Sequence, residues 1–404
     1  MLQENNDLRI KRSSDARIAN HAKRLSEQLQ MLSERMFPPT AQKSLRTFSS
    51  TEAAALVGVS DGFLRALSLE GKGPSPDLSD SGRRSYSLAQ VNELRQYMAA
   101  AKPKDAVNYL PHRRRGEKLQ TIAVANFKGG SAKTTTTIYL AQYLALHGYR
   151  VLAVDLDPQA SLTSLFGIQP EFDLGDGDTL YGAIRYDDKK RPLKDIIRKT
   201  YFDGLDLVPG NLELMEFEHD TPTAIHQRKT GAQEIFFRRV GLALASVEDD
   251  YDIVVIDCPP QLGYLTLGAV CAATALLITI HPQMVDVASM SQFLLMTSDL
   301  MSVVRDFGGE LNHDFIRYVV TRHEPSDGPQ AQIVGMLRSL FGEEVLTSTA
   351  VKSTAIADAG LTKQTLYELP KGQISRKTYD RAVEAIDAVN SEILAEVQKV
   401  WERS

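Results

Sequence analysis

The chain has 404 residues, of which 43% are hydrophobic and 24% are charged, a composition typical of folded soluble proteins. Its two cysteines are too few for a disulfide framework or a cysteine-rich metal site. The polar start lacks a signal-peptide core, and we expect no segment with the roughly 20 apolar residues that span a bilayer. We therefore expect a cytoplasmic protein of about two or three domains.

The formal net charge of −5 is unevenly divided along the chain. Residues 1–118 contain 20 Lys and Arg against 13 Asp and Glu, whereas the remainder contains 26 against 38. This asymmetry favours a polyanionic partner for the first part, although a solvated basic face gives the same counts.

The first predicted element is a helix over residues 15–36, inside an N-terminal segment that we place at residues 1–46. Apolar residues recur there at a spacing of three or four, and Pro38 and Pro39 end the pattern. The single apolar stripe must be covered, either by a second copy of the chain, which would make the helix a dimerisation element, or by this chain.

Residues 47–100 have the outline of a helix-turn-helix domain. A capped helix ends at Gly58, a second helix begins at Ser60, and the Gly/Pro/Ser-rich stretch 71–82 indicates a wing. A small helical dimerisation module is the alternative. The arginines that we expect at operator DNA are Arg65, Arg83 and Arg84.

Residues 101–118 form a basic, proline-containing linker, which contacts the DNA backbone or serves only as a solvated tether. A second large domain follows at residues 119–404. It opens with an apolar strand over residues 121–125, a glycine turn that contains Lys133, and a helix. Strand, glycine turn and helix form the context of a phosphate-binding loop, whose backbone N–H groups and lysine attract the anion.

The loop departs from the usual pattern G-x-x-x-x-G-K-[ST] at two positions. Ala132 stands where the second glycine is expected, and an additional lysine, Lys128, begins the turn.

Two later strands end in carboxylates, and together with the loop they predict a Mg-nucleotide site. Lys133 should neutralise the β- and γ-phosphates, and Thr134 should bind Mg²⁺. Asp257 should hold the water shell of the metal, and Asp157 should orient the attacking water. Asp155 either forms hydrogen bonds around the loop and Mg²⁺ or only caps its strand.

The rest of the domain alternates strands with helices. This order predicts an α/β fold with a doubly wound, mainly parallel sheet. The further strands are expected at residues 205–209, 275–280 and 315–321, and helices at 233–245, 284–304 and 329–341. Residues 167–204 read as a surface excursion.

The final helix, residues 377–401, is amphipathic with an acidic polar face, which anionic lipid would repel. We expect it to pack on the sheet, without a membrane partner. Ahead of it and within it lies a basic cluster that would attract nonspecific DNA through its phosphates, or would be only solvated surface. The cluster consists of Lys352, Lys363, Lys371, Arg376, Lys377 and Arg381.

The motifs at 128–134, 155–159 and 257–260 resemble the deviant Walker A, A′ and B boxes of the ParA/MinD ATPases. The match to ParA partition ATPases runs from about residue 121 to the end of the chain. The helix and helix-turn-helix ahead of it resemble the plasmid-type ParA architecture, and the whole chain resembles the RepA partition proteins of repABC plasmids.

The resemblance implies a homodimer that sandwiches ATP, with Lys128 reaching the partner's phosphates. It implies weak Mg²⁺-dependent ATP hydrolysis, stimulated by DNA and by a RepB/ParB-type centromere-binding protein. The ATP form would bind nonspecific nucleoid DNA, and the ADP form or the complex with RepB would bind operator DNA as a repressor. The implied ATP contacts are Lys128, Gly129, Gly130, Ser131, Ala132, Lys133, Thr134 and Thr135, with Thr321 and Arg322 near the adenine.

Three alternatives stay open at this point. A MinD-like membrane-positioning ATPase would need a basic C-terminal amphipathic helix. A redox ATPase resembling the nitrogenase iron protein would need cysteines that bridge a cluster. A transcription factor with an inactive ATPase domain would not bind ATP.

Overall fold

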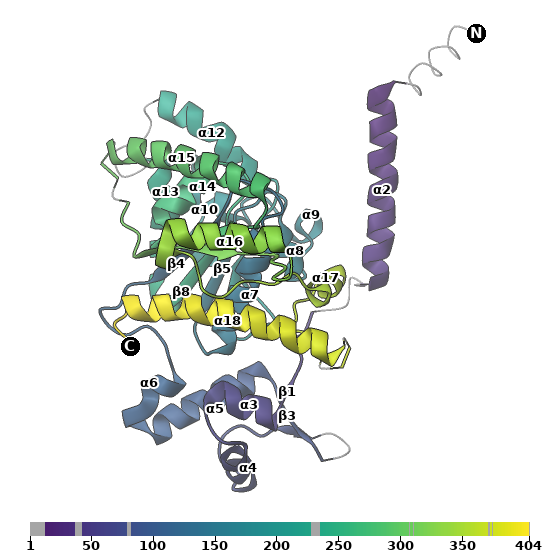
Figure 1. Ribbon diagram of the computed structural model, residues 1–404, viewed down its shortest axis with the longest axis vertical. Helices are drawn as coiled ribbons and strands as arrows, with labels where there is room; N and C mark the ends of the chain where they lie inside the picture. The colour runs from purple at the N-terminus through teal and green to yellow at the C-terminus, as the bar shows by residue number, and fades with distance from the viewer. Residues whose placement is uncertain are drawn as a thin grey trace, which may run out of the picture. The chain divides into compact units, whose positions relative to one another are not determined.

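The computed structural model describes residues 13–36, 43–78, 82–227, 235–306, 308–309, 311–370, 372–373 and 375–403. The chain divides into two units, residues 1–43 and residues 44–404. In the first unit the described element is the helix α2 (Ser14–Met36), which confirms the predicted helix (Figure 1). Within that unit its apolar residues Ile18 and Leu25 are exposed.

The second unit begins with the elements of the predicted helix-turn-helix. Ser49 caps the first helix in a reciprocal capping box with Glu52, and Gly58 ends it with a φ of +79°. Glycine tolerates this left-handed conformation, which turns the chain into the next helix, capped by Ser60. The helices are α3 (Ser50–Val57), α4 (Asp61–Leu69) and α5 (Leu88–Ala101). A small sheet of β1 (Phe48–Ser49), β2 (Asp77–Leu78) and β3 (Arg84–Tyr86) includes the predicted wing.

A seven-stranded sheet forms the centre of the second unit, in the order β10-β9-β4-β8-β5-β7-β6. All neighbouring pairs are parallel except β6 with β7. The predicted mainly parallel α/β sheet is thus confirmed. The strands are β4 (Gln120–Ala125), β5 (Val151–Asp155), β6 (Arg198–Lys199), β7 (Leu205–Val208), β8 (Ile253–Asp257), β9 (Ala275–Ile280) and β10 (Phe315–Val320).

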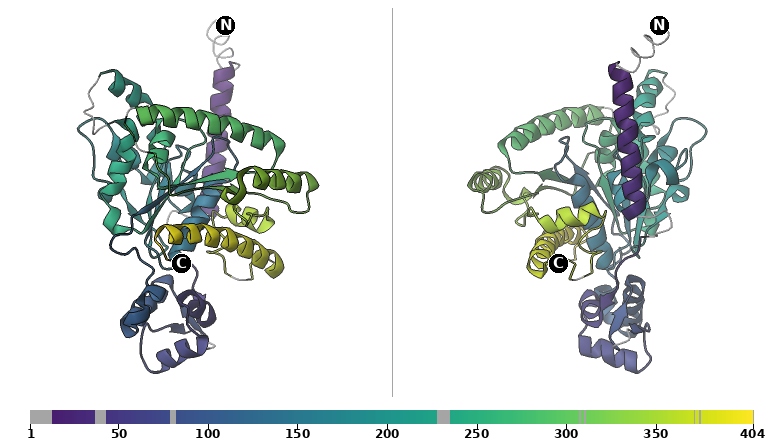
Figure 2. Two further views of the ribbon diagram at one scale, coloured as in Figure 1. Left: turned by 60° about the vertical axis from the view of Figure 1, so that its left-hand side comes forward. Right: turned by 90° about the vertical axis from the view of Figure 1, so that its right-hand side faces the viewer.

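Helices cover both faces of this sheet (Figure 2). Alternate residues of β4 enter two different cores: Ile122 and Val124 join one, and Ala123 and Ala125 join the other. The first core includes residues of α7 (Lys133–Leu146), α17 (Thr354–Leu361) and α18 (Arg376–Val400). The second includes residues of α13 (Phe236–Ala245), α14 (Tyr264–Ala272), α15 (Met284–Asp306) and α16 (Gly328–Phe341). Strands buried on both faces explain the continuous apolar runs in the sequence.

One expectation about this domain is wrong, and one helix was missed. Residues 167–204 are more than a surface excursion, because Leu180, Ile184 and Leu193 are buried in the second core. The helix α12 (Leu214–His226) was also not expected, and it contains Pro222. A proline inside a helix removes a backbone hydrogen bond, so it hides the helical pattern.

The apolar face of the C-terminal helix α18 is buried, as the periodicity predicts. Its main neighbours are α7 and α17, rather than the sheet itself. Among the described residues one helix, α15, is long and apolar enough to cross a membrane by length and composition, so our expectation that no such segment exists is wrong. Helices of soluble proteins pass the same test. Residues such as Val285 and Leu295 make its outer face apolar.

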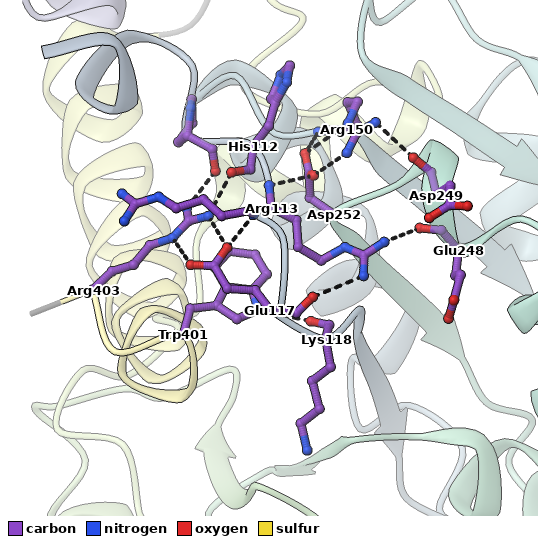
Figure 3. A network of polar contacts seen from close by, with 12 residues as sticks. His112, Arg113, Glu117, Lys118, Arg150, Glu248, Asp249, Asp252, Trp401 and Arg403 are labelled. Atoms are coloured by element: carbon purple, nitrogen blue, oxygen red, sulfur yellow. Dashed lines mark hydrogen bonds and ion pairs between the residues drawn. The ribbon is translucent and has the colours of Figure 1, made fainter. Parts of the chain in front are cut away.

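The segment expected as a linker is bonded to its surroundings (Figure 3). Arg403 donates to the carbonyl oxygens of Pro111 and His112 and pairs with Glu117 at 2.5 Å. The amide of Arg113 donates to the buried carboxylate of Asp252 at 2.8 Å. This part of the chain is therefore attached to the large domain at two places, Arg403 near its C-terminus and the buried Asp252.

Candidate nucleotide-binding site

The ends of three neighbouring strands bring the predicted site together. In the sheet, β4 pairs with β8, and β8 pairs with β5. Asp257 lies opposite Val124 on one side and opposite Asp155 on the other. Because the three strands are parallel, the glycine loop after β4 lies at the same sheet edge as both carboxylates.

The glycine loop leads directly into the N-terminus of α7, which begins at Lys133. Gly130 and Ala132 both have positive φ, +78° and +66°. The loop keeps its left-handed turn although alanine replaces glycine, and this conformation costs an L-residue about 1–2 kcal/mol. Such a turn directs successive N–H groups and the positive end of the helix dipole toward one point, which is an anion site.

Lys133 is almost fully buried, with 6% of its surface exposed. Burial lowers its pKa, and the nearby charge of Asp257 acts in the opposite direction. Its ammonium donates to the carbonyl oxygen of Lys128 at 3.2 Å. A buried ammonium that donates to a neutral carbonyl is a strong attractor for phosphate.

Asp257 is a fully buried carboxylate, and within the described residues neither of its oxygens accepts a well-aligned hydrogen bond. Burial raises its pKa well above the usual value, and the charge of Asp155 raises it further. Lys133 and Thr134 oppose this rise. A buried carboxylate without well-aligned hydrogen bonds beside a phosphate-binding loop fits a cation with its water shell.

Asp155 is also fully buried, but its oxygens have partners. They accept hydrogen bonds from the amide and hydroxyl of Thr163, at 2.8 and 2.6 Å, and from the amide of Asp157. These partners follow β5 and belong to the chain after the strand, so the contacts are those of the strand-capping alternative. Asp157 itself is partly exposed and accepts from the amide of Gln159.

Lys128 does not reach its own loop with its side chain. Its ammonium pairs with one oxygen of Asp286, in the first turn of α15. The other oxygen of Asp286 lies 2.9 Å from Nδ1 of His281, at hydrogen-bond distance. The Lys128 side chain is about one-third exposed. The structure therefore places this lysine at the rim of the site.

A cavity of about 640 Å³ opens beside the loop. Thr321 and Arg322, the residues expected near adenine, line it, and both also donate to loop carbonyls, Thr321 to Ser131 and Arg322 to Gly130. Sequence reasoning missed most of the other lining residues, because they come from α7, from residues 350–354 and from α18, which meet only in the fold. They include Tyr139, Ile386, Val389 and Asn390.

The residues expected at DNA lie on several different elements. Lys352 lines the cavity and pairs with Glu324 at 2.9 Å, whereas Lys377 and Arg381 are exposed in the first turns of α18. Lys371 lies outside the described residues. The remaining positions are Lys363 just after α17, Arg376 paired with Asp380, Arg65 paired with Asp61 on α4, Arg83 beside the wing, and Arg84 on β3.

Comparisons with known proteins place this geometry in context. A family model described as "AAA domain" matches residues 119–306. A protein of Sinorhizobium fredii that carries the provisional name replication protein A is 56% identical, over 94% of this chain and 93% of that protein. Protein SopA of Escherichia coli is 31% identical over 82% of each chain.

Two solved structures share the fold. One titled "Partition Protein" has a TM-score of 0.64 at 18% identity and covers 96% of this chain and 99% of that chain. A cobyrinic acid a,c-diamide synthase from Mycobacterium smegmatis, with a bound ATP analogue and magnesium, has a TM-score of 0.52 at 24% identity. It covers 68% of this chain and 94% of that chain.

Proposed function

The chain belongs to the ParA family of plasmid-partition ATPases, and from this we propose that it binds and slowly hydrolyses ATP at the edge of β4, β8 and β5. The observation that carries the proposal is the pairing of buried, under-bonded charges. Lys133 and the N-terminus of α7 offer positive charge to phosphates, while Asp257 offers a cation a buried carboxylate whose oxygens accept no well-aligned hydrogen bond within the described residues. A Mg-nucleotide supplies both partners at once.

Each residue has a proposed role that follows from its placement. Lys133 neutralises the β- and γ-phosphates, and Asp157 orients the attacking water. Thr134 and Asp257 would hold Mg²⁺, which supplies charge neutralisation when bound. Asp155, whose oxygens are engaged by Thr163 and Asp157, would act on the metal only through its water shell.

The functional form of the proposed enzyme is a dimer that sandwiches ATP. Lys128 supports this proposal, because its ammonium is directed toward Asp286 at the rim rather than toward its own loop. In a dimer it would supply charge to the partner's phosphates, as an arginine finger supplied in trans does.

The proposed cellular role is plasmid segregation, with DNA and protein partners. The ATP form would bind nonspecific nucleoid DNA, supported by exposed Lys377 and Arg381 on α18. A RepB/ParB-type centromere-binding protein would stimulate hydrolysis. The helix-turn-helix would bind operator DNA and repress the operon, supported by exposed Arg65 on α4 and by Arg83 beside the wing.

Mixing two inactive variants tests the dimeric site. Lys128→Ala and Lys133→Ala should each lose ATP hydrolysis. In mixed dimers, the intact loop of the first variant meets the intact Lys128 of the second, so mixing should restore part of the activity. If the mixture hydrolyses ATP no faster than the sum of the two inactive variants, Lys128 does not act on the nucleotide of the partner subunit.

A gel shift tests the DNA part separately. Operator and nonspecific DNA are incubated with ADP, with ATP and with a non-hydrolysable analogue. We expect operator binding with ADP and nonspecific binding with the analogue. Equal binding in all states would contradict a nucleotide-controlled switch.

A further inference from the structure

Arg95 of α5 joins the ends of two helices from different parts of the second unit. Its guanidinium donates to the carbonyl oxygen of Leu56 near the end of α3, at 2.8 Å, and to that of Leu146, the last residue of α7, at 2.5 Å. Both carbonyls lie at the negative ends of helices, which favour a cation. Arg95 is 2% exposed, and burial lowers its pKa to about 10, so it remains protonated at neutral pH.

The space around Arg95 is closely filled. A Cβ added to Gly148, just after α7, would lie 3.0 Å from the side chain of Arg95, and Gly148 has a φ of +87°. A second side chain of α5, Asn92, donates to Asp203 at 2.7 Å, ahead of β7. The contact between α5 and the ATPase domain is therefore closely packed and contains specific hydrogen bonds.

Arg46 ties down the other end of α3. It donates to the carbonyl oxygen of Tyr367 at 3.1 Å and pairs with Glu52 at 3.1 Å. Glu52 accepts the Ser49 amide in the capping box that starts α3. Both ends of α3 are thus attached by arginines to backbone carbonyls of the ATPase domain.

The two attachment points connect to the wall of the nucleotide cavity. The helix α7 has 14 residues, so it is a rod about 21 Å long that runs from the phosphate loop to Leu146. Tyr139 is one of the residues that line the cavity, and its hydroxyl accepts from the amide of Leu366, next to Tyr367, at 3.0 Å. Asn390, another wall residue, donates to the carbonyl of Tyr139 at 3.2 Å.

The second helix of the helix-turn-helix is linked to α3 by one further bond. The Ser50 hydroxyl, in the first turn of α3, donates to Asp61 at the start of α4, at 2.7 Å. Asp61 also pairs with Arg65, a residue expected at operator DNA. A movement of α3 therefore reaches the surface that would face DNA.

We propose that Arg46 and Arg95 transmit occupancy of the nucleotide cavity to the helix-turn-helix, by fixing both ends of α3 to α7 and to the segment at Tyr367. The inference rests on the proposed function, since it takes the ligand of the cavity to be ADP or ATP. It assigns the coupling to two arginines that do not line the nucleotide cavity and are not among the residues proposed at DNA.

Hydrogen–deuterium exchange of the full-length protein tests the coupling without DNA. With ADP at 100 times its Kd, exchange in wild-type α7 and α3 should slow, by at most about 100-fold. In Arg46→Gln/Arg95→Lys, exchange in α7 should slow as before, whereas α3 should no longer respond. Lysine retains the charge but lacks the fork that holds several acceptors.

The controls separate coupling from folding and from nucleotide binding. Lys72→Gln removes an exposed ion pair with Glu70 inside the same domain, and its α3 should respond to ADP as in the wild type. If the double variant does not fold, the single variant Arg46→Gln replaces it in the test, because this position is less buried. Its α3 should respond to ADP less than α3 of the wild type.

A full α3 response in the folded variants, or none in wild type despite slowed α7 exchange, would overturn the inference. If ADP also leaves wild-type α7 unchanged, the proposed nucleotide site is wrong and the coupling falls with it.

Discussion

The nucleotide site and the helix-turn-helix domain satisfy their polar groups to different degrees. At the nucleotide site, within the described residues, the buried Asp257 accepts no well-aligned hydrogen bond, the buried ammonium of Lys133 donates to the carbonyl of Lys128, and Ala132 is held at positive φ. In the helix-turn-helix domain, Ser49 and Ser87 complete capping boxes at the starts of α3 and α5.

This difference indicates which region has buried groups that a ligand would satisfy. Unsatisfied buried charge and backbone strain persist in a fold only where other interactions maintain them, and both are typical of ligand sites. In the helix-turn-helix domain the starts of all three helices are capped, at Ser49, Ser60 and Ser87. The buried hydroxyl of Tyr86 has no well-aligned partner among the described residues, and the residues expected at DNA, such as Arg65, are exposed. The nucleotide site would therefore gain bonds for its buried groups from a ligand, whereas the helix-turn-helix domain would contact a partner through exposed side chains.

Removing the buried lysine should have the largest effect. Lys133→Ala deletes the charge that faces the phosphates, and we expect ATP hydrolysis to fall by at least about 100-fold, the usual cost of losing one preorganised charge-stabilising group. Phosphate release in the presence of DNA measures it. Lys104→Ala, an exposed lysine outside the site, is the matched control, and wild-type activity in Lys133→Ala would contradict the assignment.

Asp257→Asn should separate activity from stability. Hydrolysis should be lost, but the nucleotide-free protein should become more stable, by about 1–3 kcal/mol, because a buried carboxylate without a partner no longer has to ionise. Urea unfolding at pH 7 without nucleotide or Mg²⁺ measures the change. A variant less stable than wild type would show that Asp257 is already satisfied in the free protein.

The same substitution has a defined pH dependence. The pKa of Asp257 is raised in the folded state above its unfolded value of 3.8, so the folded state binds the extra proton. Its contribution to stability is therefore present at low pH and is lost as pH rises through the folded pKa. The stability difference between Asp257→Asn and wild type should grow from pH 5 to pH 8, and a constant difference would exclude this titration.

The contrast also explains which features were predictable from sequence. The loop and the acids at the ends of β5 and β8 follow apolar strands, so short-range patterns located them. The cavity wall was not predictable, because Tyr139, Asn390 and residues 350–354 meet only in the fold. The attachment by Arg95 was invisible for the same reason: one arginine in a helical pattern shows no sign of the two carbonyls it will bridge.

Loss of a helix cap should have a moderate effect confined to the helix-turn-helix domain. Ser87→Ala removes the side-chain acceptor of the Gln90 amide at the start of α5. The expected loss is about 1 kcal/mol of unfolding free energy, with ATP hydrolysis per folded molecule unchanged. Chemical denaturation and phosphate release measure the two quantities. A parallel fall in hydrolysis would mean that the cap also supports the nucleotide site.

The smallest expected effect tests backbone strain in the loop. Ala132→Gly relieves a left-handed alanine, but glycine loses more conformational entropy on folding, so the net change should be near zero or stabilising by a few tenths of a kcal/mol. The same substitution at Ala55, exposed in α3, removes a good helix former and should cost about 1 kcal/mol. Denaturation of both variants without nucleotide compares them directly. Equal losses of unfolding free energy at the two positions would mean that Ala132 is unstrained, and that its left-handed conformation costs alanine no more than a helical one.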